Sequence, residues 1–135
     1  DLHSFPTRRS SDLDLISYKI RGVIYKVYNG LGPGLLESTY EAALIYQLKK
    51  DGLKVKSQVP IDIIYDGQVL PVKYRLDMLV EDKVIVELKS VEEITKIHLK
   101  QLTTYLKITG LHLGILVNFN EININDGIFR IANNL

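Results

Sequence analysis

The sequence predicts a single α/β domain, a small mixed β-sheet flanked by α-helices. Apolar residues recur at helical spacing in two segments before Gly52, and beyond that glycine they alternate with polar residues as in β-strands. A third helical segment then precedes an apolar stretch at residues 112–119, which is typical of a strand buried on both faces. Interleaved helices and strands favour one layered domain, and 135 residues with 46% hydrophobic content suffice for its core.

Residues 1–13 need a separate interpretation, because they are polar and follow neither period. Back-translated, the segment from Ser4 to Leu13 resembles a common sequencing-adapter oligonucleotide read in frame. We therefore expect residues 1–13 to be a non-native tail that arose from an assembly artefact, and residues 14–135 to form the domain. The alternatives are an ordinary disordered tail and a basic arm around Arg8 and Arg9 that grips nucleic acid.

Two amphipathic helices are expected in the first part of the domain. Residues 15–28 carry an apolar stripe at helical spacing, formed by Ile16, Ile20, Val23, Ile24 and Val27. The loop at residues 30–34 contains three glycines and a proline, which supply a helix stop and a tight connection. A second helix is expected at residues 35–50, and Asp51-Gly52 ends it.

The remaining elements follow the change of period at Gly52. Asp66-Gly67 is a strong two-residue hairpin signal between the first two expected strands. The expected elements are a strand at residues 55–65, its return strand at 69–80, a third strand at 84–90, a helix at 95–109, a strand at 112–119 and a short edge element at 122–131.

The hairpin between the second and third of these strands brings two acids together. If residues 81–83 form its turn, Val80 pairs with Val84 and Asp77 lies opposite Glu87, with Cβ atoms about 5 Å apart. Opposed carboxylates repel each other unless a proton or a cation lies between them. A hard divalent ion with oxygen ligands is the usual solution, so this pair is a candidate metal site.

A lysine accompanies these acids. Lys89 lies on the same strand face as Glu87, and the register places Arg75 opposite it. A second acid-x-lysine triplet begins at Glu81 and ends at Lys83 in the expected turn, where charges favour solubility. Glu87 and Lys89 instead interrupt an apolar strand, where burial of a charge is costly. We interpret them as catalytic residues; a structural ion pair or a solvent-facing strand surface is the alternative.

The helix at residues 95–109 adds polar candidates. Three isoleucines at helical spacing are expected to face the sheet, namely Ile94, Ile97 and Ile108. Gln101 and Tyr105 follow the same spacing and could hold a water molecule or a backbone phosphate beside the acids. The alternative is a helix-edge glutamine that bonds a loop, and a core tyrosine. His98 is expected to be a surface or structural residue and not a metal ligand, since the other histidines offer no metal-ligand spacing with it.

Composition excludes several classes of protein. The chain has no cysteine, which excludes a disulfide framework and a thiolate metal site. Its formal net charge of +1 is too small to imply nucleic acid by itself. No apolar run approaches the roughly 20 residues that span a bilayer. We therefore expect a soluble, cytoplasmic protein that does not interact with a membrane.

The candidate residues resemble the motifs of a nuclease family. Gly34, Glu37 and Tyr40 reproduce the Gly-x-x-Glu-x-x-Tyr pattern of the GxxExxY protein family, within the PD-(D/E)xK nuclease superfamily. The other matching residues and segments are Asp77, Glu87-Leu88-Lys89, Gln101 to Tyr105 and Gly114 to Phe119, and the resemblance extends from about residue 15 to residue 135. Leu76 departs from the pattern, which has a proline before the aspartate; proline there shapes the strand without adding side-chain chemistry.

The resemblance implies a restriction-endonuclease-like core and a metal site at its centre. Asp77 and Glu87 would bind Mg²⁺ or Mn²⁺, together with the backbone carbonyl of Leu88. Glu37 would approach from the second helix and complete the metal shell through water, which makes it a further catalytic candidate.

The resemblance also implies roles for residues beside the metal. Lys89 would position or help to deprotonate the attacking water and stabilise charge on the scissile phosphate. Gln101 would support the catalytic site, while Tyr40 and Tyr105 would contact the substrate.

The function implied is metal-dependent hydrolysis of phosphodiester bonds in nucleic acid, with DNA as the expected substrate. One alternative is a catalytically silent nucleic-acid-binding or accessory module on the same fold. Another is a small interaction protein whose charged hairpin is merely solvated, which clustering of the catalytic candidates in space would argue against. A homodimer is compatible with so small a domain, although no motif specifies it.

Overall fold

The chain folds into helices and strands over the whole described range. The computed structural model describes residues 8–135, so the expectation of a tail at residues 1–7 lies outside the described residues. The elements are α1 (Arg8–Leu31), α2 (Glu37–Lys50), β1 (Val55–Ile61), β2 (Ile64–Tyr65), β3 (Gln68–Val69), β4 (Tyr74–Val80), β5 (Val84–Lys89), α3 (Lys96–Thr109), β6 (Leu113–Asn118), the 3₁₀ helix η1 (Ile124–Gly127) and β7 (Ile128–Ala132). None of the described helices combines the length and the apolar content needed to cross a membrane.

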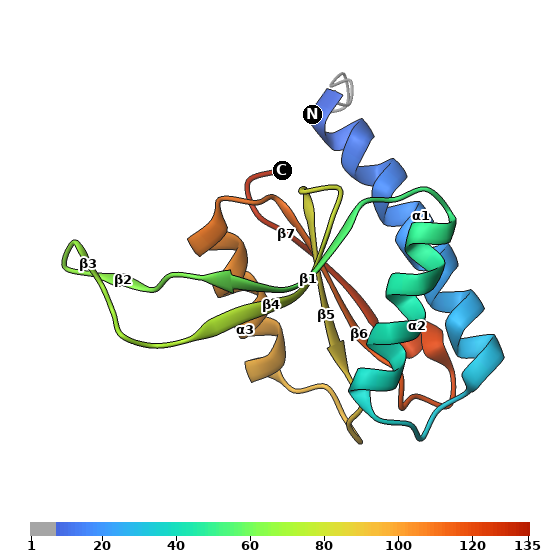
Figure 1. Cartoon of the computed structure of the whole chain (residues 1–135). Coiled ribbons are helices and arrows are strands. Elements are labelled where there is room, and N and C mark those ends of the chain that lie inside the picture. Colours follow the sequence, from blue (N-terminus) through green and yellow to red (C-terminus); the bar gives the residue numbers. More distant parts are fainter. Residues whose placement is uncertain (1–7) are drawn as a thin grey trace.

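A five-stranded mixed sheet forms the centre of the domain (Figure 1). Its strand order is β1-β4-β5-β6-β7. β5 and β6 run parallel and are joined by the crossover helix α3, whereas the other neighbouring strands of this sheet are antiparallel. The predicted α/β fold with a small mixed sheet is confirmed.

Helices cover both faces of this sheet, and β5 separates two apolar cores. Val84, Val86 and Leu88 face α1 and α2 and belong to a cluster that we name the first core. Ile85 packs with Leu116 of β6 beneath α3, in a cluster that we name the second core. Successive side chains of a strand point to opposite faces, so this pattern follows directly from the sequence of β5.

The first helix begins at Arg8, upstream of its predicted start. Leu13 is buried and extends the apolar stripe of α1 by one turn. Nη2 of Arg9 donates a hydrogen bond to the backbone carbonyl of Asn134 at 3.1 Å. Residues 8–13 therefore pack as part of α1, because Leu13 adds buried apolar surface to the helix, and this packing argues against the alternative of a disordered tail for these residues. Their origin from an adapter sequence stays a prediction.

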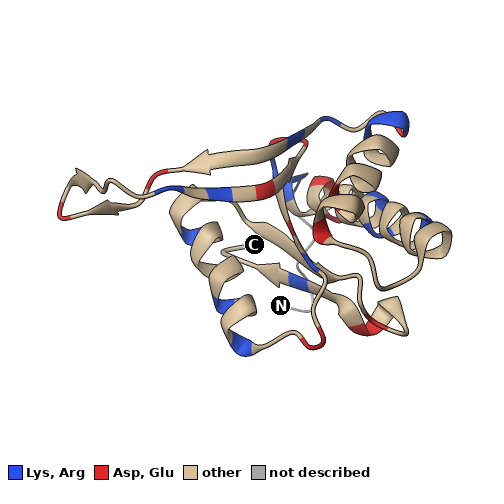
Figure 2. Cartoon of the chain, turned by 60° about the horizontal axis from the view of Figure 1, so that its bottom comes forward, with Lys and Arg blue, Asp and Glu red and all other residues tan. Residues whose placement is uncertain are grey.

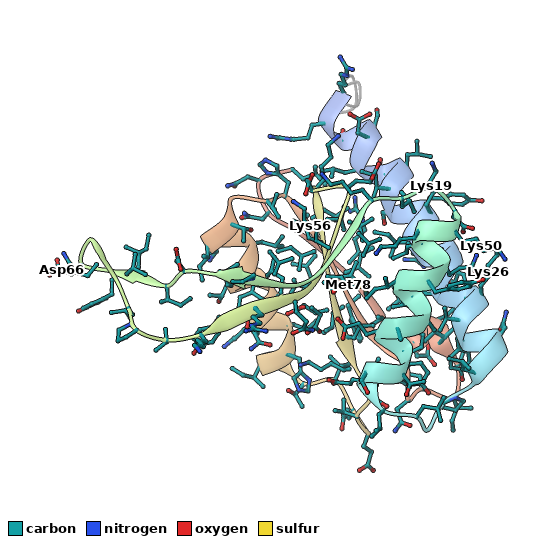
Figure 3. All side chains as sticks on the ribbon, viewed as in Figure 1. Lys19, Lys26, Lys50, Lys56, Asp66 and Met78 are labelled. Carbon is teal, nitrogen blue, oxygen red and sulfur yellow. The ribbon has the colours of Figure 1, made fainter. Side chains whose placement is uncertain are left out.

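The predicted long hairpin is interrupted beyond the main sheet. β2 and β3 form a separate two-stranded sheet around Asp66-Gly67. Pro71 lies between β3 and β4, and because proline cannot donate to a strand ladder, it splits the predicted return strand. The result is an arm that projects from the sheet, with Asp66 at its tip (Figure 1; Figure 3).

Candidate functional site

The β4–β5 hairpin has the predicted register. Its paired residues are Met78 with Val86, Leu79 with Ile85 and Val80 with Val84. Glu81 and Asp82 both have a φ of 55° and form a tight left-handed turn. Beyond Met78 and Val86 the backbone pairing stops, and the next residues in register are Asp77 and Glu87.

Side chains replace backbone pairing at this point. The Asp77 N–H donates to Oε2 of Glu87 at 2.7 Å, and the Leu88 N–H donates to Oδ2 of Asp77 at 2.9 Å. The other carboxylate oxygens, Oε1 of Glu87 and Oδ1 of Asp77, accept no hydrogen bond from an N–H group of the described residues, and the two side chains lie close enough to share a proton. The two strands therefore diverge around a pair of carboxylates that each keep one oxygen available to a ligand.

Glu87 lies in an environment that disfavours its negative charge. Its residue surface is only 6% exposed. Burial, followed by the negative charge of Asp77, raises the pKa of Glu87 from 4.5 to about 8, although the hydrogen bond from the Asp77 N–H and the positive charge of Lys89 lower it. Lys89 is itself half-buried at the end of β5. The pair is thus a buried acidic centre whose charge the protein compensates incompletely.

Tyr105 of α3 lies on the second-core side of this acidic centre. Its ring is buried and meets the ring of Tyr74 edge-on, with centroids 6.5 Å apart. Burial raises the pKa of the Tyr105 hydroxyl, and the charges of Glu87 and Asp77 add to the effect. The predicted proximity of Tyr105 to the acids is therefore consistent with the structure.

The predicted inward stripe of α3 is wrong. Ile97 is 68% exposed and Gln101 is exposed, whereas the buried residues of the helix are Leu102, Tyr105 and Leu106. Gln101 precedes Tyr105 by one turn on a neighbouring side of α3 and makes no hydrogen bond with the described residues. Gln101 is therefore at the solvent-exposed edge of the site instead of within it.

Glu37 reaches the site from α2, of which it is the first residue. A cavity of about 290 Å³ is lined by Glu37, Ser38, Glu41, Gln58, Asp77 and Leu88. Glu37 therefore shares one cavity with Asp77, in agreement with its expected approach from the second helix. An acid in the first turn also stabilises a helix through its dipole, so Glu37 has a structural role in addition.

Tyr40 does not lie where a substrate can reach it. The side chain is fully buried and stacks on Phe119, with ring centroids 4.4 Å apart. Its hydroxyl donates to the Gly32 carbonyl at 2.6 Å and accepts from the Leu35 N–H at 3.1 Å. The expected substrate contact of Tyr40 is corrected to a structural role, because these bonds hold the glycine-rich loop that leads into α2.

Along both β1 and β4, the side chains change from one face of the sheet to the other near the site. Val55 packs on the first core, whereas Val59, which strand alternation would place on the same face, packs on the second. β4 changes in the same way, since Met78 (Figure 3) belongs to the first core and Leu76 to the second. The paired strands therefore exchange the faces that they present to the two cores.

The rotation occurs where Gln58 and Asp77 oppose each other. The flanking pairs, Ser57 with Met78 and Val59 with Leu76, share one register, so no residue is inserted. Gln58 has a φ of 51°, a left-handed conformation that costs a non-glycine residue roughly 1–2 kcal/mol. No motif or period in the sequence singled out Gln58 as a functional residue. Pro60, two positions later, is the one residue of this strand that indicates an irregular edge strand from the sequence.

The described histidines and acids do not make up a complete metal site. Nδ1 of His98 accepts from the Thr95 N–H at 3.0 Å and caps α3, which agrees with the expected structural role. Within residues 8–135, no group of three or more Asp, Glu, His or Cys side chains is placed to hold a metal ion. Asp77 and Glu87 would thus need backbone, water or substrate oxygens as further ligands.

A comparison with known families identifies the superfamily of the chain. A sequence profile of the PD-(D/E)XK nuclease superfamily matches residues 14–131. The chain belongs to this superfamily. No curated protein and no solved structure matches it.

The PD-(D/E)XK assignment agrees with the architecture of the domain. The mixed five-stranded sheet flanked by helices is consistent with the expected restriction-endonuclease-like core. The matched residues include the hairpin with Asp77, Glu87 and Lys89 and the start of α2 with Glu37. Membership of the narrower GxxExxY family stays a prediction.

Proposed function

We propose that this protein is a metal-dependent phosphodiesterase that hydrolyses nucleic acid, with DNA as its substrate. The observation that carries the proposal is the divergence of β4 and β5 around Asp77 and Glu87, which leaves one oxygen of each carboxylate available. Membership of the PD-(D/E)XK nuclease superfamily supports nuclease chemistry at this place.

The donor atoms fit Mg²⁺ or Mn²⁺. Hard divalent cations take oxygen ligands, and Asp77 and Glu87 present two carboxylates on adjacent strands. A cation between them would offset the repulsion that raises the pKa of Glu87. The backbone carbonyl of Leu88 and, through water, the carboxylate of Glu37 are the further ligands that we propose.

The neighbouring side chains have distinct proposed roles in hydrolysis. A bound cation would supply polarisation of the phosphoryl oxygen. The ammonium group of Lys89, half-buried beside Glu87, would orient the attacking water and offset negative charge on the scissile phosphate. Tyr105 would donate its hydroxyl to the same polar network, and Gln101 would contact the substrate from the exposed edge of α3.

Lysines on α3 support a polyanionic substrate. Lys96, Lys100 and Lys107 are exposed and recur at helical spacing along one side of α3 (Figure 2). No acid among the described residues forms an ion pair with them. Lys54 and Lys56, by contrast, are both paired with Asp82, so α3 is the better candidate for phosphate contacts.

The decisive experiment measures cleavage of single-stranded and duplex DNA and RNA with Mg²⁺, Mn²⁺ or a chelator. We expect cleavage to require a metal and to fall by about 100-fold or more in Glu87→Ala and in Lys89→Ala. Glu93→Ala, which removes an exposed carboxylate of the β5–α3 loop, is the matched control. Activity that survives both site substitutions would contradict the proposed site.

Nucleic-acid binding without cleavage is the second candidate function. It is favoured by the lack, within residues 8–135, of a third acidic or histidine side chain in metal-binding position. Binding of a labelled DNA duplex without product formation in either metal would select this function.

The proposed setting is the cytoplasm, and the proposed assembly is a homodimer. A single domain in a chain of 135 residues would cover only a short stretch of nucleic acid. Light scattering should give about twice the chain mass of 15.4 kDa, and cell fractionation should place the protein in the cytoplasm. A monomer at all concentrations would contradict the proposed dimer.

A further inference from the structure

We infer that Gln58 is a positioning residue, whose left-handed backbone and bond to Glu41 hold Asp77 in the orientation that hydrolysis requires. The inference rests on the proposed function. It is independent of the superfamily motifs, since neither Gln58 nor Glu41 belongs to the residues that carry them.

The left-handed backbone of Gln58 is the first of the two features that orient Asp77. Gln58 lies opposite Asp77 at the point where β1 and β4 exchange the faces that they present to the two cores. At the same point the Asp77 N–H donates to the carboxylate of Glu87, and the Asp77 carboxylate accepts from the Leu88 N–H. The change of strand orientation at Gln58 therefore sets the geometry of both hydrogen bonds of Asp77, the one that its N–H donates and the one that its carboxylate accepts.

The side-chain hydrogen bond of Gln58 is the second feature that orients Asp77. Its Nε2 donates to Oε1 of Glu41 at 3.0 Å, and both residues line the cavity that also contains Asp77. Glu41 lies one turn after Glu37 on α2. This bond therefore joins the helix that carries Glu37 to the strand position that faces Asp77.

A purely structural role would not require a glutamine at this position. Glycine and asparagine adopt a left-handed backbone more readily, so backbone geometry alone would favour them. A side chain long enough to reach Glu41 from β1 distinguishes Gln58 from both residues. The combination of an unfavourable backbone and a specific side-chain bond at a cavity wall points to a functional constraint.

Three variants separate the effect of the left-handed backbone of Gln58 from the effect of its side-chain bond to Glu41. Gln58→Val opposes the left-handed backbone, because β-branched residues rarely adopt it. Gln58→Gly permits that backbone and removes the bond to Glu41, and Glu41→Ala removes the same bond from the other side. Ser57→Val is the matched control, because Ser57 is an exposed neighbour on β1 and pairs normally with Met78.

Two measurements are made on each full-length variant. Amide hydrogen exchange, followed by NMR, reports the bonds that the Asp77 and Leu88 N–H groups make, and it needs neither metal nor substrate. Steady-state kinetics on a DNA substrate with Mn²⁺ gives kcat and KM separately.

Gln58→Val should exchange both amides faster and lower kcat by about tenfold or more, with KM changed by less than about threefold. Gln58→Gly and Glu41→Ala should retain slow exchange at both amides and lower kcat by a common, smaller factor. Ser57→Val should match the wild type. Wild-type exchange and kcat in Gln58→Val would overturn the inference, as would wild-type kcat in both Gln58→Gly and Glu41→Ala.

The design distinguishes failure of this inference from failure of the proposed function. If the wild type cleaves no nucleic acid, the proposed function fails, and the exchange of the two amides in Gln58→Val still decides whether Gln58 positions Asp77. If Gln58→Val does not fold, Gln58→Gly and Glu41→Ala decide through kcat. A loss of kcat common to both supports the inference, and unchanged kcat overturns it.

Discussion

Replacement of Glu87 by glutamine should change the way in which the stability of the protein depends on pH. Glutamine keeps a side-chain oxygen that can accept the Asp77 N–H, a bond that is 2.7 Å long in the structure. It removes the buried negative charge. The substitution therefore isolates the electrostatic cost of Glu87 from its contribution to the hairpin.

The sign of the effect follows from the raised pKa of Glu87. In the unfolded chain this carboxyl group loses its proton near pH 4.5, whereas in the folded protein it keeps the proton up to about pH 8. Between these values the folded state binds more protons than the unfolded state, so the free energy of unfolding falls as the pH rises. The penalty is absent below the lower value and complete above the upper one.

The size of the effect can be bounded. One unit of difference in pKa corresponds to about 1.4 kcal/mol, which sets an upper limit of about 5 kcal/mol for the whole interval. Relaxation and water penetration around a buried charge reduce such penalties, so we expect a loss of about 2 kcal/mol. Glu87→Gln should match the wild type near pH 4 and exceed its free energy of unfolding by this amount near pH 8.5.

Urea unfolding at several pH values, in the presence of a chelator, measures this difference. Glu93→Gln is the control, since it removes an exposed carboxylate and should follow the wild type. Parallel pH profiles for the wild type and Glu87→Gln would refute the reasoning. Addition of Mn²⁺ near pH 8.5 should stabilise the wild type by about 2.7 kcal/mol at 100 times the Kd and leave Glu87→Gln nearly unchanged.

Three further substitutions test the packing and the chemistry around the site. Gly114→Ala should lower the free energy of unfolding by about 1–3 kcal/mol, because its Cβ would lie 2.8 Å from Cδ1 of Leu102. Gly22→Ala, whose Cβ meets nothing within 4 Å, is the control in the same urea assay, and equal losses would contradict the packing argument. Tyr40→Phe should cost about 1–2 kcal/mol, because the hydroxyl bonds to the glycine-rich loop are lost; an unchanged unfolding curve would argue against that role. Lys89→Met should lower kcat by about 100-fold or more while calorimetry shows Mn²⁺ affinity within about threefold of the wild type, and a weakened affinity instead would place Lys89 in metal binding.

The register of the catalytic hairpin could be predicted because strand alternation and turn chemistry are local. Val84, Val86 and Leu88 must face the same core, and a slip of one residue would turn Glu87 and Lys89 into it. The period of apolar residues therefore determined which side chains oppose each other across β4 and β5.

The inward face of α3 could not be predicted, because the helix offers two overlapping apolar stripes. Contact with the sheet decides between them. Gly114 has no side chain, which allows Leu102 to approach β6 closely and turns Ile97 toward solvent. This choice is made by contact with β6, and not by the spacing of residues within α3, and it also places Gln101 at the exposed edge.

The sequence by itself determined the order of the elements, the facing pair of Asp77 and Glu87, and the accompanying Lys89. Those features follow from the local period of apolar residues, which does not depend on contacts with distant parts of the chain. Only the tertiary structure decided the burial of Tyr40 and the left-handed backbone of Gln58. Tyr40 is buried because α2 packs on the first core, and Gln58 lies where β1 and β4 exchange faces between the two cores. No local pattern of residues contains that information.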